Sequence, residues 1–267
     1  MEIDLVLSGS GTRFPVFIGA LKALEEKNIT IKRVAGTSGG ALIASCIACN
    51  IKADDLFQMV LQTDFTKFKD FSLISLVRNY GLYKGDVIEK LANIVTGGIA
   101  FEYLPMDCRI IACNPFNSEM MVFSKANTPD VKLSEAIRYS TSVPLIFGYK
   151  KYKGQPVVDG MLSSNYPIDI FDDNERKTLG LRITTSSRKK CCFHKINIFE
   201  YLWFLAESLI ISLENEHIED AKNAETINID AQKFDPINFD ITSKDKDEMF
   251  QLGYLTTLAY LGAMNNG

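Results

Sequence analysis

Two strand–turn–helix units occupy the first 50 residues, and they restrict the fold more than any other feature of the sequence. The first is a short apolar run, IDLVL, which enters the turn SGSG and is followed by apolar residues at helical spacing in VFIGALKALEEKN. The second is RVAGTSGG, which is followed by the apolar segment ALIASCIACN. Buried strands that turn at glycines into helices are typical of parallel sheets. The pattern therefore predicts an α/β fold.

Later segments extend this sheet. CRIIACNPF and MMVFSK predict two adjacent strands joined by a turn at 115–118, and QPVVDG and LGLRITTS predict two more. Residues 53–95 are predicted to be mostly helical. KLSEAIRYSTSVPLIF predicts a helix that ends near Pro144, because proline cannot continue a helix.

The C-terminal region shows two amphipathic helical patterns, at about 196–223 and 245–264, around an irregular middle. The sequence contains no internal repeat, low-complexity tract or obvious linker. We therefore expect a single domain over 1–267, in which 190–267 is a mainly helical C-terminal part.

Charge and composition restrict the partners. Hydrophobic residues make up 46% of the chain and the formal net charge is −4, which argues against nucleic acid as a partner. The N-terminus lacks the basic and apolar regions of a secretory signal, and no run of 18 apolar residues is present. We therefore expect a cytoplasmic protein with reduced cysteines. Cys46 and Cys49 are expected to be buried thiols of a helix, because no second Cys/His pair lies at ligand spacing.

Ser38 is the candidate nucleophile. The segment GTSGG matches the Gly-x-Ser-x-Gly pattern of a nucleophile elbow, with Gly36 and Gly40 on either side. Glycines at these positions allow close backbone packing, and the N-terminus of the following helix directs free N–H groups at the serine. The flanking VAG and ALIASCIA supply the required strand and helix. The alternative is an ordinary glycine-rich turn with a capping serine.

The earlier turn, SGSGTR at 8–13, is a candidate oxyanion loop. Small residues in succession expose backbone N–H groups, which stabilise negative charge on a carbonyl oxygen. Gly9, Ser10 and Gly11 are the candidate donors. A phosphate-binding loop is the rival interpretation. However, the Lys-Ser/Thr pair of a P-loop is missing, and the next glycine after Gly11 is Gly19.

A serine hydroxyl needs a base, and Asp159 is the best candidate. It follows the apolar strand PVV and begins an Asp-Gly turn, so it can point from a strand end into a cleft. The order Ser38, Asp159, His194 would formally give an α/β-hydrolase triad. That fold places its nucleophile well into the sheet, after an upstream oxyanion strand, whereas Ser38 follows the second predicted strand. His194 also lies in the polar cluster RKKCCFHK, which is typical of a solvated loop. Both observations favour a dyad in which the carboxylate of Asp159 acts directly as the base. The other histidine is His217. An ordinary Asp-Gly turn is the remaining alternative.

Taken together, these segments resemble the patatin-like phospholipase family. That family has a glycine-rich oxyanion loop, then a Gly-x-Ser-x-Gly serine, then an aspartate in an Asp-Gly-Gly or Asp-Gly-Ala motif. The corresponding segments here are SGSGTR with GALKALEE, then GTSGG, then VVDGMLSSNYP. AIRYSTSVPLIF is similar to the family's helix-and-proline segment before the aspartate strand. The resemblance covers about residues 3–185.

The resemblance implies a three-layer α/β/α sandwich with a central, mostly parallel sheet. It also implies two-step hydrolysis of fatty-acyl esters of phospholipids or related lipids by a Ser38–Asp159 dyad, without cofactor or catalytic metal. Arg13 and Gly160 join the two glycines around Ser38 as supporting motif residues.

The sequence departs from the family at three positions. Ser10 replaces the middle glycine of the loop, Phe14 replaces its last glycine, and Met161 replaces the small residue after Asp-Gly. We expect Ser10 to restrict the loop backbone and Phe14 to add bulk near the pocket mouth, with weaker or narrower activity as a consequence. Arg13 keeps the basic residue of the motif, and we expect it to hold the loop or a substrate phosphate.

A peripheral membrane contact is predicted for residues 188–204. RKKCCFHKINIFEYLWFL combines basic and aromatic side chains, a composition that suits an interfacial patch or a lid. A surface loop followed by a core helix is the alternative. Two other functions stay open: an acylesterase or thioesterase that acts on soluble acyl donors, and a catalytically weak patatin-like scaffold that binds a lipid or a protein.

Overall fold

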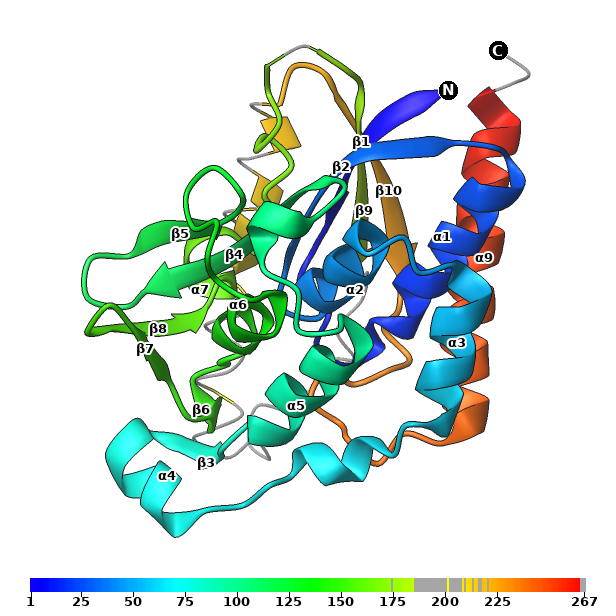
Figure 1. Ribbon diagram of the computed structural model, residues 1–267. Helices are drawn as coiled ribbons and strands as arrows, with labels where there is room; N and C mark the ends of the chain where they lie inside the picture. The colour runs from blue at the N-terminus through cyan, green and yellow to red at the C-terminus, as the bar shows by residue number, and fades with distance from the viewer. Residues whose placement is uncertain are drawn as a thin grey trace.

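A large sheet between helical layers forms the framework of the protein (Figure 1). The computed structural model describes residues 1–173, 175–184 and 221–264, together with residues 201, 208, 210–212, 214, 215, 218 and 219. Within this part the main sheet has eight strands, and its central strands are parallel. The predicted α/β/α sandwich with a mostly parallel sheet is therefore confirmed.

Five parallel strands make up the centre of the sheet, in the order β10-β9-β1-β2-β4. They are β1 (Glu2–Leu7), β2 (Thr30–Thr37), β4 (Asp107–Asn114), β9 (Thr178–Thr184) and β10 (Ala224–Asp230). Side chains of β1 alternate between two cores, with Leu5 in the larger cluster and Val6 in the smaller one on the other face. Because both faces are covered, the stretch of β1 from Leu5 to Leu7 is continuously apolar.

The edge beyond β4 is antiparallel. It contains β5 (Glu119–Phe123), β8 (Gln155–Asp159) and β7 (Lys150–Tyr152). A separate parallel pair joins β3 (Gly81–Tyr83) to β6 (Leu145–Phe147). The sequence predicted β4, β5, β8 and β9. The prediction of an irregular segment before the last helix was wrong in part, because β10 forms there and pairs with β9.

Helices cover the sheet at most of the predicted places. They are α1 (Pro15–Glu26), α2 (Gly39–Ala48), α3 (Ala53–Gln62), α4 (Leu73–Asn79), α5 (Asp86–Val95), α6 (Leu133–Ser140), α7 (Met161–Ser164) and α9 (Ser243–Met264). Short 3₁₀ turns are η1 (Gly11–Arg13), η2 (Phe65–Phe68) and η3 (Phe101–Tyr103). The helices α1 and α9 lie side by side (Figure 1), in contact at Gly19 and Gly253. A Cβ at Gly19 would lie 1.9 Å from the carbonyl oxygen of Phe250, so the close approach requires glycine.

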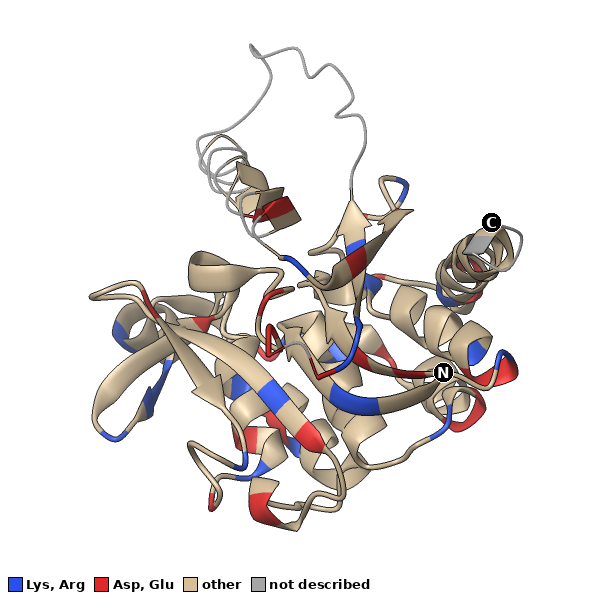
Figure 2. Cartoon of the chain, turned by 90° about the horizontal axis from the view of Figure 1, so that it is seen from above, with Lys and Arg blue, Asp and Glu red and all other residues tan. Residues whose placement is uncertain are grey.

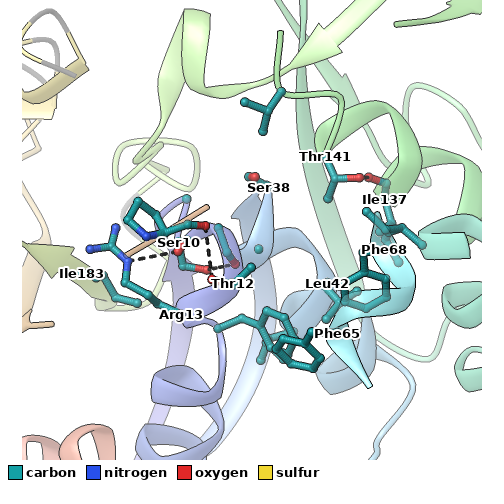
Figure 3. Close-up of a pocket in the computed structure, with 18 of the residues that line it drawn as sticks. Ser10, Thr12, Arg13, Ser38, Leu42, Phe65, Phe68, Ile137, Thr141 and Ile183 are labelled. Atoms are coloured by element: carbon teal, nitrogen blue, oxygen red, sulfur yellow. Dashed lines mark hydrogen bonds between the residues drawn. The ribbon is translucent and has the colours of Figure 1, made fainter. Parts of the chain in front are cut away.

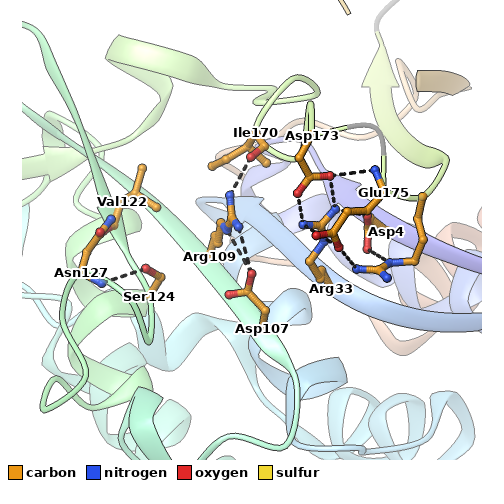
Figure 4. A network of polar contacts seen from close by, with 11 residues as sticks. Asp4, Arg33, Asp107, Arg109, Val122, Ser124, Asn127, Ile170, Asp173 and Glu175 are labelled. Atoms are coloured by element: carbon orange, nitrogen blue, oxygen red, sulfur yellow. Dashed lines mark hydrogen bonds and ion pairs between the residues drawn. The ribbon is translucent and has the colours of Figure 1, made fainter. Parts of the chain in front are cut away.

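An ion-pair network fixes the amino ends of the central strands (Figure 4). Asp4 at the start of β1 is fully buried, and its carboxylate accepts hydrogen bonds from Arg33 at 2.5 Å and from Arg176 at 3.2 Å. Arg33 also pairs with Asp173. Removing one member of such a buried pair leaves an uncompensated charge. The network therefore serves the framework, at the end of the strands opposite to Ser8 and Ser38.

Acidic and basic positions are interspersed over the helices and strands (Figure 2). Within the residues that the structure describes, no helix is both long enough and apolar enough to cross a bilayer. Cys46 lies on α2 as a buried free thiol, as predicted, whereas Cys49 is a half-buried free thiol directly after the last residue of that helix. Burial raises the pKa of Cys46 to about 12, so this thiol stays protonated.

Candidate active site

Strand β4 brings the ends of β2 and β8 together. Its residues Ile110 and Ile111 pair with β2 and also with β5, whereas Ala112 and Cys113 pair with β5 and also with β8. A strand has two edges, so β2 and β8 must share the edge that β5 does not occupy. Thr37 lies opposite Ile111, and Asp159 lies opposite Ala112. Ser38, which follows Thr37, therefore lies next to Asp159.

Ser38 occupies a strained turn between β2 and α2. Its φ of 54° and ψ of −123° are rare for a residue with a side chain, and such outliers gather at functional sites. The turn is held in part by the Ser38 N–H group, which donates to the Ser140 hydroxyl at 2.8 Å. Ser140 in turn donates to the carbonyl of Ile111 on β4 at 2.5 Å. The serine turn is thus tied both to α6 and to the strand that positions Asp159.

The supporting glycines allow the backbone segments around Ser38 to touch. A Cβ at Gly36 would lie 2.6 Å from the backbone of Gly40, and one at Gly40 would lie 2.4 Å from the carbonyl oxygen of Ser8. A Cβ at Gly160 would lie 2.6 Å from the carbonyl oxygen of Ile111. Side chains at these positions would push apart the elbow, the glycine loop and the aspartate turn.

Asp159 is fully buried at the end of β8, and burial raises its pKa to about 7. Desolvation disfavours the charged carboxylate, and the Ser38 hydroxyl and the Met161 N–H group oppose this increase in part. Oδ1 accepts the Met161 N–H bond at 2.9 Å, whereas Oδ2 has no hydrogen-bond partner of ordinary geometry among the residues that the structure describes. One carboxylate oxygen is therefore held in place, and the other remains open to a proton.

The glycine loop at 8–13 lies beside this pair. The Gly9 N–H group donates to the carbonyl of Asn165 at 2.8 Å, so it is already engaged in the fold. Among the described residues, the N–H groups of Ser10 and Gly11 have no acceptor. Arg13 is buried, and its Nε donates to the carbonyl of Ser10 at 3.2 Å (Figure 3). Arg13 thus braces the loop.

The three departures from the family pattern have different structural consequences. Ser10 has a φ of −138°, which any residue can adopt, so its side chain does not strain the loop. The glycine requirement falls on Gly11, whose φ is +57°. Phe14 stacks on Phe65 with ring centroids 5.1 Å apart, and both line the cavity described next. Met161 also lines this cavity.

A largely apolar cavity of about 730 Å³ opens from Ser38 and the glycine loop (Figure 3). This volume lies within the usual range of ligand sites. Its walls come from α2, α3, η2, α5 and α6, with the apolar side chains Leu42, Ile43, Leu56, Val60, Phe65, Phe68, Ile88, Leu91 and Ile137 among them. Such a cavity suits a hydrocarbon chain whose reacting end lies at Ser38.

A buried ion pair forms part of the same wall. Arg182 at the end of β9 donates from Nε to Glu214 at 2.7 Å, and its second contact to the same carboxylate is 2.6 Å long. Asn165 donates to the other oxygen of Glu214. Sequence inspection did not single out these three residues or Ser140, because each gains its role only from contacts between distant segments.

Two sequence hypotheses fall on residues outside the described part. His194 and His217 both lie there, and so does almost all of the proposed contact region at 188–204. The structure places Ser38, Asp159, the glycine loop and Arg13 together.

Comparison with known proteins agrees with this architecture. A family model described as "Patatin-like phospholipase" matches residues 5–172. The chain is 30% identical to the uncharacterized protein YqhO of Bacillus subtilis (strain 168), over 98% of each chain. It is 27% identical to the probable lipid hydrolase 463L of Invertebrate iridescent virus 6, over 62% of each.

Among solved structures, VipD from Legionella pneumophila aligns with a TM-score of 0.69 and 18% identity, over 98% of this chain and 67% of that one. At this identity the likeness concerns the fold. The family model and the full-length similarity to YqhO go further, and they show that the chain belongs to the patatin-like phospholipase family, a family of lipid acyl hydrolases.

Proposed function

We propose that this protein hydrolyses fatty-acyl esters of phospholipids or related lipids with Ser38 as nucleophile and Asp159 as its base. The observation that carries the proposal is a buried Asp159 beside the strained Ser38, with an Oδ2 that no described residue engages in a hydrogen bond of ordinary geometry. A carboxylate with a pKa of about 7 is a far better base near neutrality than an exposed one. No histidine is needed in this scheme.

In the first step Ser38 Oγ attacks the ester carbonyl carbon while its proton moves to Asp159 Oδ2. Negative charge develops on the carbonyl oxygen, and the N–H groups of Ser10 and Gly11 stabilise it. The N–H group of Gly39, at the start of α2, adds a third donor. The tetrahedral intermediate then collapses, and the leaving alcohol takes the proton from Asp159. The product is an acyl ester on Ser38.

In the second step water replaces the alcohol. Asp159 accepts a proton from the water as it attacks the acyl carbonyl, and the same N–H groups stabilise the second oxyanion. Collapse returns the proton to Ser38 and releases the fatty acid. The proton is thus taken up and given back once in each step, so Asp159 ends each cycle as a carboxylate.

The cavity supports a long apolar acyl chain as the substrate group. An extended chain beside Leu42, Phe65 and Phe68 removes its surface from water, and each buried CH₂ group contributes about 0.8 kcal/mol. This binding term favours lipids over short soluble esters.

The test measures fatty-acid release from phosphatidylcholine in mixed micelles and hydrolysis of a p-nitrophenyl acyl ester. We expect the wild-type protein to act on both, whereas Ser38→Ala and Asp159→Asn lose each activity by about a thousandfold or more. Ser45→Ala is a matched control, because this buried serine donates only within α2. Full activity in either site variant would refute the dyad, and a wild-type protein that cleaves only soluble esters would refute the lipid substrate.

A further inference from the structure

Helix α4 has the reverse of the usual burial pattern, because its apolar side chains face solvent and a polar one is buried. Its one buried side chain is Ser75, which is 3% exposed. Three apolar side chains on the same helix face solvent: Leu73 is 67% exposed, Ile74 is 68% and Val77 is 74%. Helices of soluble proteins place such residues against the core. An exposed apolar face of this kind marks an interaction site.

Neighbouring segments extend this apolar face into one patch, here called the α4 surface. It consists of Phe71, Leu73, Ile74, Leu76, Val77, Tyr80, Leu82 and Leu145, all of them exposed. The last member belongs to β6, where Leu145 pairs with Gly81 of β3 directly after Tyr80. In Figure 1 these elements form a projection at the lower end of the molecule.

Leu145 is held outward by a strained backbone. Its φ is +69°, a region that a leucine rarely adopts and that costs about 1–3 kcal/mol. The side chain is nevertheless 59% exposed, so packing inside the described part of the protein covers less than half of it. Contact with an apolar partner would offset that cost.

The charge around the α4 surface differs from that of the whole chain. The chain carries 33 acidic and 29 basic residues. Between residues 66 and 84 the basic residues are Lys67, Lys69, Arg78 and Lys84, and the acidic residue is Asp70. Lys69 pairs with Asp240 at 2.7 Å, so the basic rim consists of Lys67, Arg78 and Lys84. Asp70 faces inward to α5, where its carboxylate accepts the N–H groups of Gly85 and Asp86. An apolar patch with a basic rim matches a bilayer that contains anionic lipid.

The α4 surface also adjoins the acyl cavity. Ile146 and Phe147, the two residues after Leu145, line the cavity, and so does Phe68, three residues before Phe71. Ile94 of α5 is exposed and lines the cavity as well. A partner seated on the α4 surface would therefore lie beside residues that also line the cavity.

We propose that the α4 surface is a membrane-docking site that inserts its apolar side chains into a bilayer containing anionic phospholipid. The inference rests on the proposed function in one respect, since a lipid substrate must pass from the bilayer into the cavity. Tyr80 and Tyr149, whose rings stack 6.3 Å apart, provide the aromatic side chains that favour the headgroup region.

The test uses the full chain, with flotation on vesicles of phosphatidylcholine containing about one-fifth phosphatidylserine. The variant is the double substitution Leu73→Gln and Val77→Gln, which keeps helix propensity and alters side chains that make no core contact. The matched control is Phe116→Gln, in the β4–β5 turn, where the phenylalanine is 83% exposed. Hydrolysis of a soluble p-nitrophenyl ester and light scattering are measured on all three proteins.

We expect the wild-type and Phe116→Gln proteins to float with the vesicles. The partition coefficient of the double variant should be lower by about tenfold or more. All three should hydrolyse the soluble ester equally. Wild-type-like flotation of the double variant, or no flotation of the wild-type protein, would overturn the proposal. So would a wild-type dimer that the double variant alone converts to monomers. Absence of ester hydrolysis in all three proteins would count against the proposed function, and flotation would still decide the docking site.

Discussion

Ser38 and Asp159 lie next to each other because consecutive residues of β4 pair with two different strands, first β2 and then β8. Thr37 of β2 lies opposite Ile111, and Asp159 of β8 lies opposite Ala112. The residue after β2 and the residue at the end of β8 are therefore adjacent, although 121 positions separate them in the sequence. The Ser140 hydroxyl, which bridges Ser38 and Ile111, fixes this junction further.

The pH dependence of activity follows from Asp159. Because burial raises its pKa to about 7, the fraction of the basic carboxylate falls as the pH drops below that value. We expect kcat/KM for a soluble ester to decrease about tenfold per unit on the acid side and to reach a plateau above about pH 8. His194→Gln and His217→Gln should leave this profile unchanged. A profile whose acid limb disappears in either histidine variant would identify a histidine as the base.

The same pKa makes stability depend on pH. The folded Asp159 binds its proton up to a pH of about 7, whereas the unfolded chain loses it near 3.8. The stabilising contribution of the protonated carboxyl is complete below about pH 4, and it is lost as the pH rises to about 7. We therefore expect Asp159→Asn to raise the melting temperature at pH 8 by more than at pH 5. Equal differences at both pH values would show that this carboxyl does not titrate as proposed.

Ser140 should position the nucleophile. Ser140→Ala removes the acceptor of the Ser38 N–H group and the donor to the Ile111 carbonyl, both buried. We expect the free energy of unfolding to decrease by about 1–3 kcal/mol. We also expect kcat to fall about tenfold with little change in KM, because the elbow loses its fixed orientation. Chemical denaturation and steady-state kinetics measure the two effects. Ser45→Ala is the control, and an equal loss there would remove the special role of Ser140.

The glycine loop should tolerate change at Ser10 but not at Gly11. Ser10 has an ordinary φ, so Ser10→Ala should keep activity within about threefold. A Cβ at Gly11 would lie 2.1 Å from the carbonyl oxygen of Pro236, and its φ is +57°. Gly11→Ala should therefore displace the loop and reduce kcat about a hundredfold or more, as loss of one oxyanion donor does. The reverse order of sensitivity would show that the donors lie elsewhere.

The strands and helices that position the site could be predicted from local pattern. β1, β2 and β8 are short apolar runs that end at glycine or at Asp-Gly, and α2 follows its strand directly. β10 was missed because AETINID has only two large apolar residues, Ile227 and Ile229, and lies among polar segments. Only pairing with β9 makes it a strand, and that neighbour is 40 residues away.

The candidate pair Ser38 and Asp159 could be proposed from the sequence, but the residues that support it could not. Ser38 and Asp159 each lie in a short motif, whereas Asn165, Ser140 and Arg182 have no local signal. Gly9 illustrates the difference. Its motif indicated an oxyanion donor, yet its N–H group donates to the Asn165 carbonyl, a contact that only the folded chain creates. The same limit applies to α4, whose apolar residues suggest a core helix until their exposure is known.

The most direct test of the central claim is covalent labelling with a fluorophosphonate, read by intact mass and by peptide mapping. The folded wild-type protein should gain one phosphonyl group, on the peptide that contains Ser38. Asp159→Asn should label far more slowly, and Ser38→Ala should not label at all. Labelling of Ser38→Ala at the wild-type rate, or a folded wild-type protein that gains no label, would contradict Ser38 as the nucleophile.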